Sequence, residues 1–312
     1  MSASSLRYVT LDVFTNTKFA GNPLAVVELP PSTSLSQEQK QTIAREFNYS
    51  ETVFLHMRQE HARERQWDID IFTLDQELPF AGHPTIGTAC YVLSSVIKDA
   101  LRGNEPLKGA FNTKAGRIDL EYDNSRQAAK AAIPHNIHVH ERRFGRNQVL
   151  EVQESLRGSD TSLGSSPVVS VVKGMTFILV DLKDEETLRK CKPTANHANV
   201  ELDQEWRPSF VGMYYYVRLP DSGDGTRNLR TRMIEGALED PATGSAACTL
   251  ASFLSLQEDE AGTTAKYSIT QGVEMGRKSD IGVEVTLGGS REVVTVKLTG
   301  SAVQVLEGRL SL

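Results

Sequence analysis

The sequence LPFAGHPTIGTA, from Leu78 to Ala89, has a counterpart in EDPATGSAA, from Glu239 to Ala247. Each stretch begins with residues that end a strand, and each continues through a loop of small residues into a helix rich in Ala and Cys. These helices are predicted over residues 84–97 and from Ser245 to Leu256. Strands precede and follow both, so the second half of the chain repeats the order of the first. The sequence therefore predicts an α+β fold of two domains related by duplication.

The segments around these two stretches contain further strand and helix patterns. A helix is predicted over residues 34–47, with Ser34 or Ser36 as its N-cap, and a short one over residues 185–191. Runs of β-branched and aromatic residues predict strands at 7–14, 52–57, 67–74, 116–122, 168–180, 210–219, 229–234, 266–271, 282–287, 293–298 and 302–310. The expected first domain covers residues 1–122 and is joined by a C-terminal strand near 300–312; the second covers residues 123–299.

Composition excludes several classes of protein. The 312 residues carry 34 basic and 40 acidic side chains, a net charge of −6, which argues against a nucleic-acid-binding face. No window reaches the ~18 apolar residues of a membrane helix, and the N-terminal segment does not resemble a secretory signal. The three cysteines are far apart and form no CxxC pair, which excludes a disulfide scaffold. We therefore expect a soluble cytoplasmic protein that binds neither nucleic acid nor membrane.

The two loops have a composition suited to binding an anion. Unpaired N–H groups at a helix start attract negative charge, and small residues allow a ligand close to the backbone. The candidate contacts for a small carboxylate are Gly82 in the first loop and Thr243, Gly244 and Ser245 in the second. The alternative is two ordinary helix starts, in which Thr85 and Ser245 serve only their helices.

Two residues are candidates for proton transfer. His83 lies between Gly and Pro where the first helix begins, and imidazole titrates near neutral pH. Glu51 directly precedes an apolar strand, and partial burial there would raise the pKa of its carboxyl group, as a general acid/base requires. The alternatives are a hydrogen-bonded loop histidine and a surface glutamate in a turn.

Three other histidines are close together in the chain. His135, His138 and His140 have a spacing at which the last two share one face of a strand, and His197 could add a further metal ligand. No carboxylate or cysteine at a suitable spacing supports such a site. The sequence therefore predicts no metal site.

Five blocks of sequence resemble the PhzF-like phenazine biosynthesis family and occur in that family's order. They are DVFTNTKFAGNPLAVVE (12–28), SETVFL (50–55), LPFAGHPTIGTA (78–89), EDPATGSAA (239–247) and QGVEMGR (271–277). The resemblance implies the diaminopimelate epimerase fold, with two pseudo-symmetric domains, each a mixed barrel-like sheet around a central helix, and a site between them. It also implies a homodimer.

The resemblance further implies isomerisation of trans-2,3-dihydro-3-hydroxyanthranilate or a similar small carboxylic acid. In that family's pattern Glu51 moves the proton, while His83 and Asp240 hold the amino and hydroxyl groups of the substrate and help to place it. Ser245 and the helix-end N–H groups near Gly82 and Gly244 hold the carboxylate. This chemistry needs no nicotinamide, flavin or metal.

Two other functions compete with this one. A binding or regulatory protein with the same cleft would have no use for Glu51. An epimerase or racemase of the same fold uses one cysteine at each helix start, but Cys90 lies seven residues beyond His83, about 10 Å along a helix. Cys248 is also too far along its helix, so both cysteines are predicted to be buried packing residues. Lys278 follows QGVEMGR where many relatives have Pro, which affects the expected pocket rather than the acid/base set.

Overall fold

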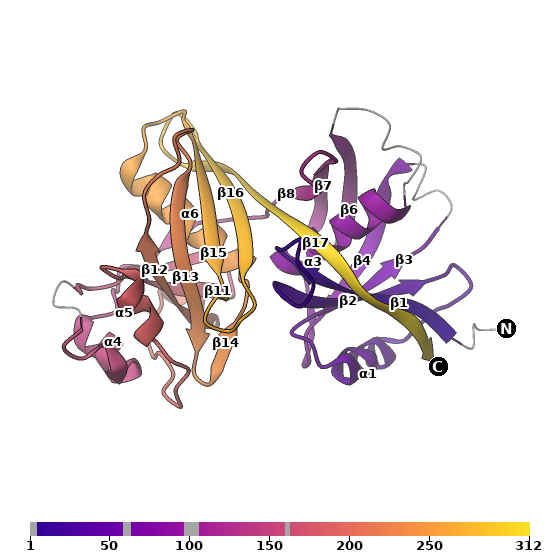
Figure 1. Ribbon diagram of the computed structural model, residues 1–312, viewed down its shortest axis with the longest axis horizontal. Coiled ribbons are helices and arrows are strands. Elements are labelled where there is room, and N and C mark those ends of the chain that lie inside the picture. Colours follow the sequence, from indigo (N-terminus) through magenta and orange to yellow (C-terminus); the bar gives the residue numbers. More distant parts are fainter. Residues whose placement is uncertain (1–4, 59–63, 97–105, 160–162) are drawn as a thin grey trace. The chain divides into compact units, whose positions relative to one another are not determined.

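A computed structural model describes residues 5–58, 64–96, 106–159 and 163–312 (Figure 1). The chain forms two units: the first comprises residues up to Ile133 together with Leu298–Leu312, and the second is Pro134–Lys297. The predicted boundary after Tyr122 precedes strand β8 (Ala128–Ala132), which pairs with β7 in the first unit.

The first unit is a closed ring of eight strands. They are β1 (Ser5–Val13), β2 (Asn22–Leu29), β3 (Thr52–His56), β4 (Gln66–Phe72), β6 (Leu107–Thr113), β7 (Gly116–Asp123), β8 and the C-terminal part of β17 (Val293–Ser311). Each pairs with the next, and β17 closes the ring by pairing with both β8 and β1. The β2–β3 and β4–β6 pairs are parallel. A two-residue strand, β5 (Glu77–Leu78), pairs with the end of β4.

Strand β17 differs from the prediction of two strands at 293–298 and 302–310. It is one strand of 19 residues that continues through Gly300. A Cβ atom at Gly300 would lie 2.3 Å from Cδ1 of Phe14, so this position needs a residue without a side chain. The glycine therefore marks a close approach between β17 and the Phe14 ring, not a turn.

Helix α3 (Gly82–Tyr91) lies inside this ring. All ten of its residues are buried, and it contacts β1, β2, β3, β7 and β8. A Cβ atom at Gly87 would lie 2.6 Å from Val13 Cγ2 and 2.7 Å from Leu24 Cδ2, so the helix has no room for a side chain on that face. The α-helix ends earlier than predicted and continues as a π-helical turn, Val92–Val96; the predicted end at Ile97 lies outside the described residues.

Helix α1 (Gln37–Phe47) confirms the helix predicted over residues 34–47 and selects Ser36 as its N-cap. Ser36 Oγ accepts the Gln39 N–H, and the Gln39 side chain accepts the Ser36 N–H, which forms a capping box. Its buried face, Ile43 and Ala44, packs with Phe54 of β3.

The second unit repeats the strand pairing of the first. Its strands are β9 (His138–Val139), β10 (Val168–Val172), β11 (Met175–Asp181), β12 (Phe210–Arg218), β13 (Arg227–Glu235), β14 (Leu238–Asp240), β15 (Thr264–Gln271), β16 (Ser279–Leu287) and the start of β17. From β10 to β16 the pairs run antiparallel, parallel, antiparallel, parallel and antiparallel, as they do from β1 to β7. The short strand β14 pairs with β13 as β5 pairs with β4.

The helices of the second unit occupy corresponding places in the chain. Helix α5 (Glu185–Lys190) lies between β11 and β12, as α1 lies between β2 and β3, and α6 (Gly244–Glu258) corresponds to α3. The extra helix α4 (Arg146–Val152) belongs to the stretch between β9 and β10. The α+β fold of two similar barrel-like domains, each with a buried helix, is thereby confirmed.

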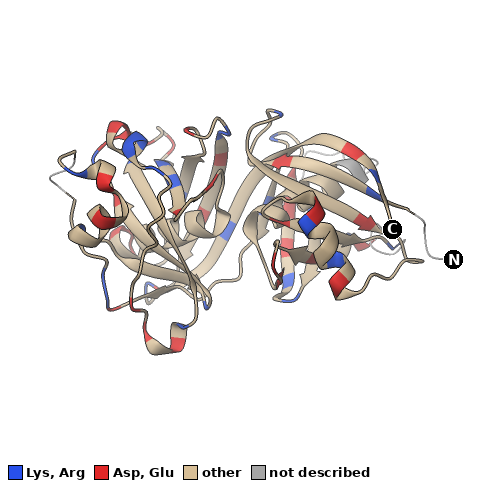
Figure 2. Cartoon of the chain, turned by 90° about the horizontal axis from the view of Figure 1, so that it is seen from below, with Lys and Arg blue, Asp and Glu red and all other residues tan. Residues whose placement is uncertain are grey.

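Acidic and basic residues are interspersed on the helices and strands of both units (Figure 2). Within the described residues, no helix combines the length and the apolar character that crossing a membrane requires.

We expect Gly87→Leu to destabilise the protein, because the added side chain must displace Val13 and Leu24 inside the ring. The expected loss in the free energy of unfolding is about 1–3 kcal/mol, measured by urea denaturation. Gly289→Ala is the control, since a Cβ atom there meets nothing within 4 Å. Equal stability of Gly87→Leu and the wild type would show that α3 is not tightly enclosed.

Candidate active site

Glu51 and His83 are brought together in the first unit. Glu51 directly precedes β3, and His83 is the second residue of α3. Nδ1 of His83 lies 3.3 Å from Oε2 of Glu51, with side-chain exposures of 5% and 18%. The two groups are in ion-pair contact, yet Glu51 Oε2 has no hydrogen-bond partner among the described residues. Two of the residues predicted for proton transfer therefore lie side by side.

Burial is the main influence on the Glu51 carboxyl group. It raises the pKa above the ordinary value of 4.5, because a carboxylate loses water contacts that the neighbouring groups do not fully replace. The side chain of Ser50 opposes this rise through a hydrogen bond, but has the smaller effect. The raised pKa moves the titration of the Glu51 carboxyl group toward neutral pH. Its carboxylate is therefore a stronger proton acceptor than that of an ordinary glutamate.

Helix α3 begins beside this pair, since His83 is its second residue. Ala81 is the N-cap, and in the described part of the chain no side chain caps the helix. The Thr85 hydroxyl donates to the Ala81 carbonyl at 2.8 Å, so it does not serve the first-turn N–H groups. Gly82, the first residue of α3, is buried. In α6, likewise, the side chain of the N-cap residue Thr243 makes no capping hydrogen bond, and Gly244 is the first helical residue.

Asp240 and Thr243 are brought together in the second unit. Strand β14 ends at Asp240, and the loop after it leads into α6. The Thr243 hydroxyl donates to Asp240 Oδ2 at 2.5 Å. Ser245, the second residue of α6, is half-buried, and its carbonyl accepts the Thr249 hydroxyl. The residues predicted for this loop therefore form one local group.

Gln271, which the sequence analysis did not assign to the site, orders this loop. It is fully buried at the end of β15, and its Nε2 donates to the Asp240 carbonyl at 2.8 Å and to Thr243 Oγ1 at 3.0 Å. Its Oε1 accepts the Tyr214 hydroxyl at 3.1 Å. Because Thr243 Oγ1 accepts from Gln271, its own proton is directed to Asp240. Gln271 thus sets both the position and the hydrogen-bond direction of the Asp240 carboxylate.

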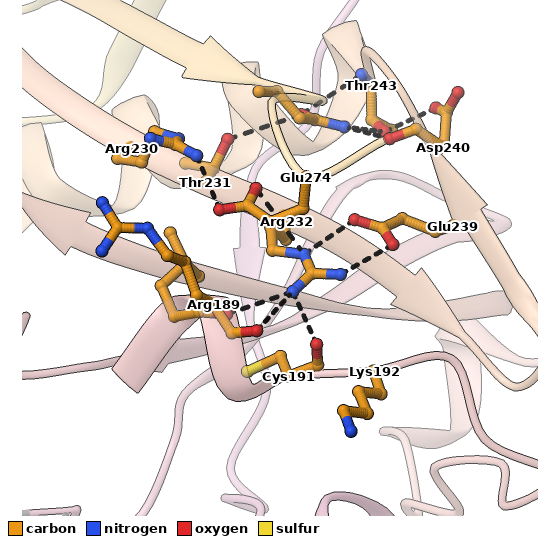
Figure 3. Close-up of polar contacts among 12 residues, drawn as sticks. Arg189, Cys191, Lys192, Arg230, Thr231, Arg232, Glu239, Asp240, Thr243 and Glu274 are labelled. Atoms are coloured by element: carbon orange, nitrogen blue, oxygen red, sulfur yellow. Dashed lines mark hydrogen bonds and ion pairs between the residues drawn. The ribbon is translucent and has the colours of Figure 1, made fainter. Parts of the chain in front are cut away.

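A buried ion pair lies under the same loop (Figure 3). Arg232 of β13 donates to both oxygens of Glu239, at 2.7 and 2.8 Å, and on its other side to the Cys191 carbonyl at 2.5 Å. The side chains of Arg232 and Glu239 are only 5% and 9% exposed. This bidentate pair joins β14, next to Asp240, to the end of α5. The signal for this ion pair in the sequence was the presence of charged residues, Arg230 and Arg232, at alternate positions of a buried strand.

The structure thus describes two groups of candidate residues, one in each unit. The first contains Glu51, Gly82 and His83; the second contains the residues Asp240, Thr243, Gly244, Ser245 and Gln271.

Cys90 and Cys248 are buried, as predicted, and Cys191 is buried as well. Cys90 and Cys248 face the interior from within α3 and α6, and Cys191 follows α5. Burial raises the pKa of Cys90 and of Cys191 to about 12 and that of Cys248 further. These thiols are protonated near neutral pH, so they do not supply the thiolate pair of a cysteine epimerase.

Comparisons with known proteins relate this chain to one family. Residues 11–308 match the sequence model of a family described as phenazine biosynthesis-like protein. An uncharacterized isomerase of Mesorhizobium japonicum is 31% identical over 97% of this chain and 98% of its own. The trans-2,3-dihydro-3-hydroxyanthranilate isomerase of Pseudomonas aeruginosa is 31% identical over 98% of this chain and 99% of its own.

The fold also matches solved structures. The crystal structure of a phenazine biosynthesis protein of the PhzF family from Bacillus anthracis superposes with a TM-score of 0.76. The match covers 99% of both chains at 20% identity, and so reports a shared fold.

The raised pKa of Glu51 predicts a pH-dependent stability difference for Glu51→Gln. Ionising Glu51 is harder in the folded state, so the wild type loses stability as pH rises from 4.5 through the folded pKa. The glutamine variant has no such loss. The free energy of unfolding of the variant minus that of the wild type should therefore increase from about pH 4 to about pH 8. The increase should be ~1.4 kcal/mol for each pH unit by which folding raises the pKa of Glu51.

Urea denaturation at the two pH values measures this difference. Glu46→Gln, at an exposed position of α1, is the matched control and should show no comparable change. A pH-independent difference for Glu51→Gln would contradict the raised pKa.

The ordering role of Gln271 predicts a large effect of an isosteric change. Gln271→Glu replaces the amide nitrogen that donates to the Asp240 carbonyl and to Thr243 Oγ1 by a carboxylate oxygen that cannot donate, so it should lower the free energy of unfolding by about 1–3 kcal/mol at neutral pH. The same substitution at the exposed Gln257 of α6 should change it by less than ~0.5 kcal/mol. Equal effects at both positions would rule out the ordering role.

Proposed function

Because this chain belongs to the phenazine biosynthesis-like family and is an isomerase, we propose that it moves a proton between two carbon atoms of one small carboxylic acid. The observation that carries the proposal is the Glu51 carboxyl group, buried against His83 where an uncapped helix begins. A half-buried carboxyl with a raised pKa has little structural purpose, but it is the group that a proton shift near neutral pH requires.

Glu51 acts as both base and acid in this proposal. Its carboxylate takes a proton from a carbon atom that an adjacent π-system acidifies, and the resulting carboxylic acid returns the proton to another carbon of the same system. The substrate gains and loses one proton, so no oxidant or reductant is consumed. His83, 3.3 Å from Glu51 Oε2, positions the carboxyl group and stabilises charge beside it.

The second group of residues serves recognition. The hydroxyl of Thr243 and the amide of Gln271 hold Asp240 in one orientation, which suits a carboxylate that accepts hydrogen bonds from an amino or hydroxyl group of the substrate. The first-turn N–H groups of α3 and α6, together with Ser245, attract the substrate carboxylate.

The substrate class follows from these contacts and from the relatives. A carboxylate, an amino or hydroxyl group and an acidified carbon describe a small unsaturated amino acid, and one relative isomerises trans-2,3-dihydro-3-hydroxyanthranilate. We propose a substrate of that class and a reaction without cofactor. A homodimer and a cytoplasmic location complete the proposal and rest on the family resemblance and the composition.

We expect Glu51→Gln to lose about 10²–10⁴-fold in turnover while still binding the substrate, because the amide keeps the shape but transfers no proton. Reaction with trans-2,3-dihydro-3-hydroxyanthranilate in D₂O, followed by NMR, measures both turnover and deuterium incorporation. The wild type should place solvent deuterium in the product. Glu46→Gln, on the exposed surface of α1, should react like the wild type.

The same experiment separates an enzyme from a binding protein. A compound that raises the melting temperature of both wild type and Glu51→Gln but is never converted by the wild type would support the binding protein. Full turnover in Glu51→Gln would remove Glu51 from the mechanism.

A further inference from the structure

A cluster outside the proposed active site contains two of the histidines noted in the sequence. His138 belongs to β9 and His140 follows it, while Asp203 immediately precedes the 3₁₀ turn Gln204–Trp206. Nε2 of His138 lies 2.6 Å from Asp203 Oδ2, and Nδ1 of His140 lies 3.5 Å from the same oxygen. One ligand atom from each residue lies within 4.8 Å of the others. The chain thus brings a carboxylate from over 60 residues away to the histidine pair.

A chain of hydrogen bonds determines which nitrogen of His140 carries a proton. Ser209 Oγ donates to the Phe210 carbonyl, which can only accept. Ser209 Oγ must then accept from Thr176 Oγ1 at 2.8 Å, and Thr176 Oγ1 from Ser170 Oγ at 2.6 Å. Ser170 Oγ is left to accept from His140 Nε2 at 2.9 Å.

His140 therefore carries its proton on Nε2 and has a lone pair on Nδ1. The Asp203 N–H, 3.2 Å from Nδ1, donates to this lone pair and independently agrees with the assignment. The His140 imidazole is buried, its unprotonated Nδ1 faces the Asp203 carboxylate, and its Nε2 donates to the Ser170 hydroxyl. A histidine that binds a metal has this protonation and this orientation.

We propose that His138, His140 and Asp203 bind a divalent transition metal ion, with Zn²⁺ as the best fit. Two imidazole nitrogens and one carboxylate oxygen are a common set of protein ligands for zinc. Ser170 supplies the outer hydrogen bond that orients His140. The side chains of His138 and Asp203 are 32% and 28% exposed, so solvent can supply the fourth ligand.

Small movements are enough to admit the ion. Ligand atoms around a tetrahedral zinc ion lie about 3.4 Å apart, so the His138–Asp203 contact must open by less than ~1 Å. The widest separation in the cluster, at most 4.8 Å, must close by up to ~1.4 Å. The metal replaces the hydrogen bond between these side chains and the long one from the Asp203 N–H to Nδ1. It joins β9 to the turn that contains Trp206, two segments far apart in the sequence, and therefore stabilises the second unit.

Trp206 provides an optical signal for this site. Its ring stacks on His138 with centroids 4.5 Å apart and an interplanar angle of 8°. The chain has two tryptophans, and the other, Trp67, belongs to β4 of the first unit. In the variant Trp67→Phe, tryptophan fluorescence therefore reports on the cluster alone.

The experiment uses the full chain without a histidine tag, freed of metal by a chelator. Zn²⁺ is added to saturation, and bound zinc per chain is measured by elemental analysis after dialysis. Calorimetry gives the affinity, and Ni²⁺ quenching of Trp206 in Trp67→Phe localises the ion. We expect one zinc ion per chain, a raised melting temperature and quenching that Zn²⁺ prevents by competition.

Two ligand variants and one control test the assignment. His138→Phe keeps an aromatic ring against Trp206, and Asp203→Asn keeps the size of the side chain; each should weaken zinc binding by about tenfold or more. His197→Phe removes another histidine–carboxylate pair of the same unit, His197–Glu235 at 2.7 Å, and should bind zinc like the wild type.

Three results would overturn the proposal: no zinc retained by the wild type, equal affinity in Asp203→Asn and the wild type, or loss of binding in His197→Phe. Circular dichroism of each variant establishes that it is folded, and His138→Phe and Asp203→Asn provide two independent tests if one of them is not.

Discussion

The enclosure of a helix by a curved sheet is the constraint on which each unit depends. Every residue of α3 is buried, so its sequence consists mostly of small or apolar residues, with His83 as the titratable exception near its start. A helix enclosed in this way still has first-turn N–H groups that need a partner, and these are satisfied only where the helix start meets water or a ligand. Gly82 begins α3 without a side-chain cap in the described structure, and His83 follows directly. The fold thereby places His83 beside Glu51 at the start of the enclosed helix.

The duplicated units use the same arrangement in different ways. In the first, a buried carboxyl group lies against a histidine with little compensation for its lost water, which raises its affinity for a proton. In the second, Thr243 and Gln271 satisfy the Asp240 loop, and Arg232 and Glu239 brace the strand beside it. The first environment favours proton transfer, and the second favours a fixed hydrogen-bond pattern for recognition.

Much of the fold could be predicted from particular segments of the sequence. Some patterns depend only on the local environment of their own segment and could therefore be interpreted without the tertiary structure. They are the capping residues before α1, the small residues of α3 and α6 and the alternation in the strands. The break predicted between residues 298 and 302 was wrong, because the strand continues through Gly300, which passes close to Phe14, and a sequence does not reveal such a contact. The cluster of His138, His140 and Asp203 could not be foreseen from the sequence, since Asp203 lies far along the chain from the histidines that it contacts.

The sequence by itself determined the α+β class, the internal duplication, the two helix starts and the candidate residues Glu51, His83 and Asp240. Only the tertiary structure decided that Glu51 contacts His83, that Gln271 directs the proton of Thr243 toward Asp240, and that two histidines meet a distant carboxylate. The physical reason is that periodicity and capping report the local burial and backbone of a segment. The contacts that carry chemistry join residues from different strands, and strand pairing and side-chain packing bring those residues within hydrogen-bond distance.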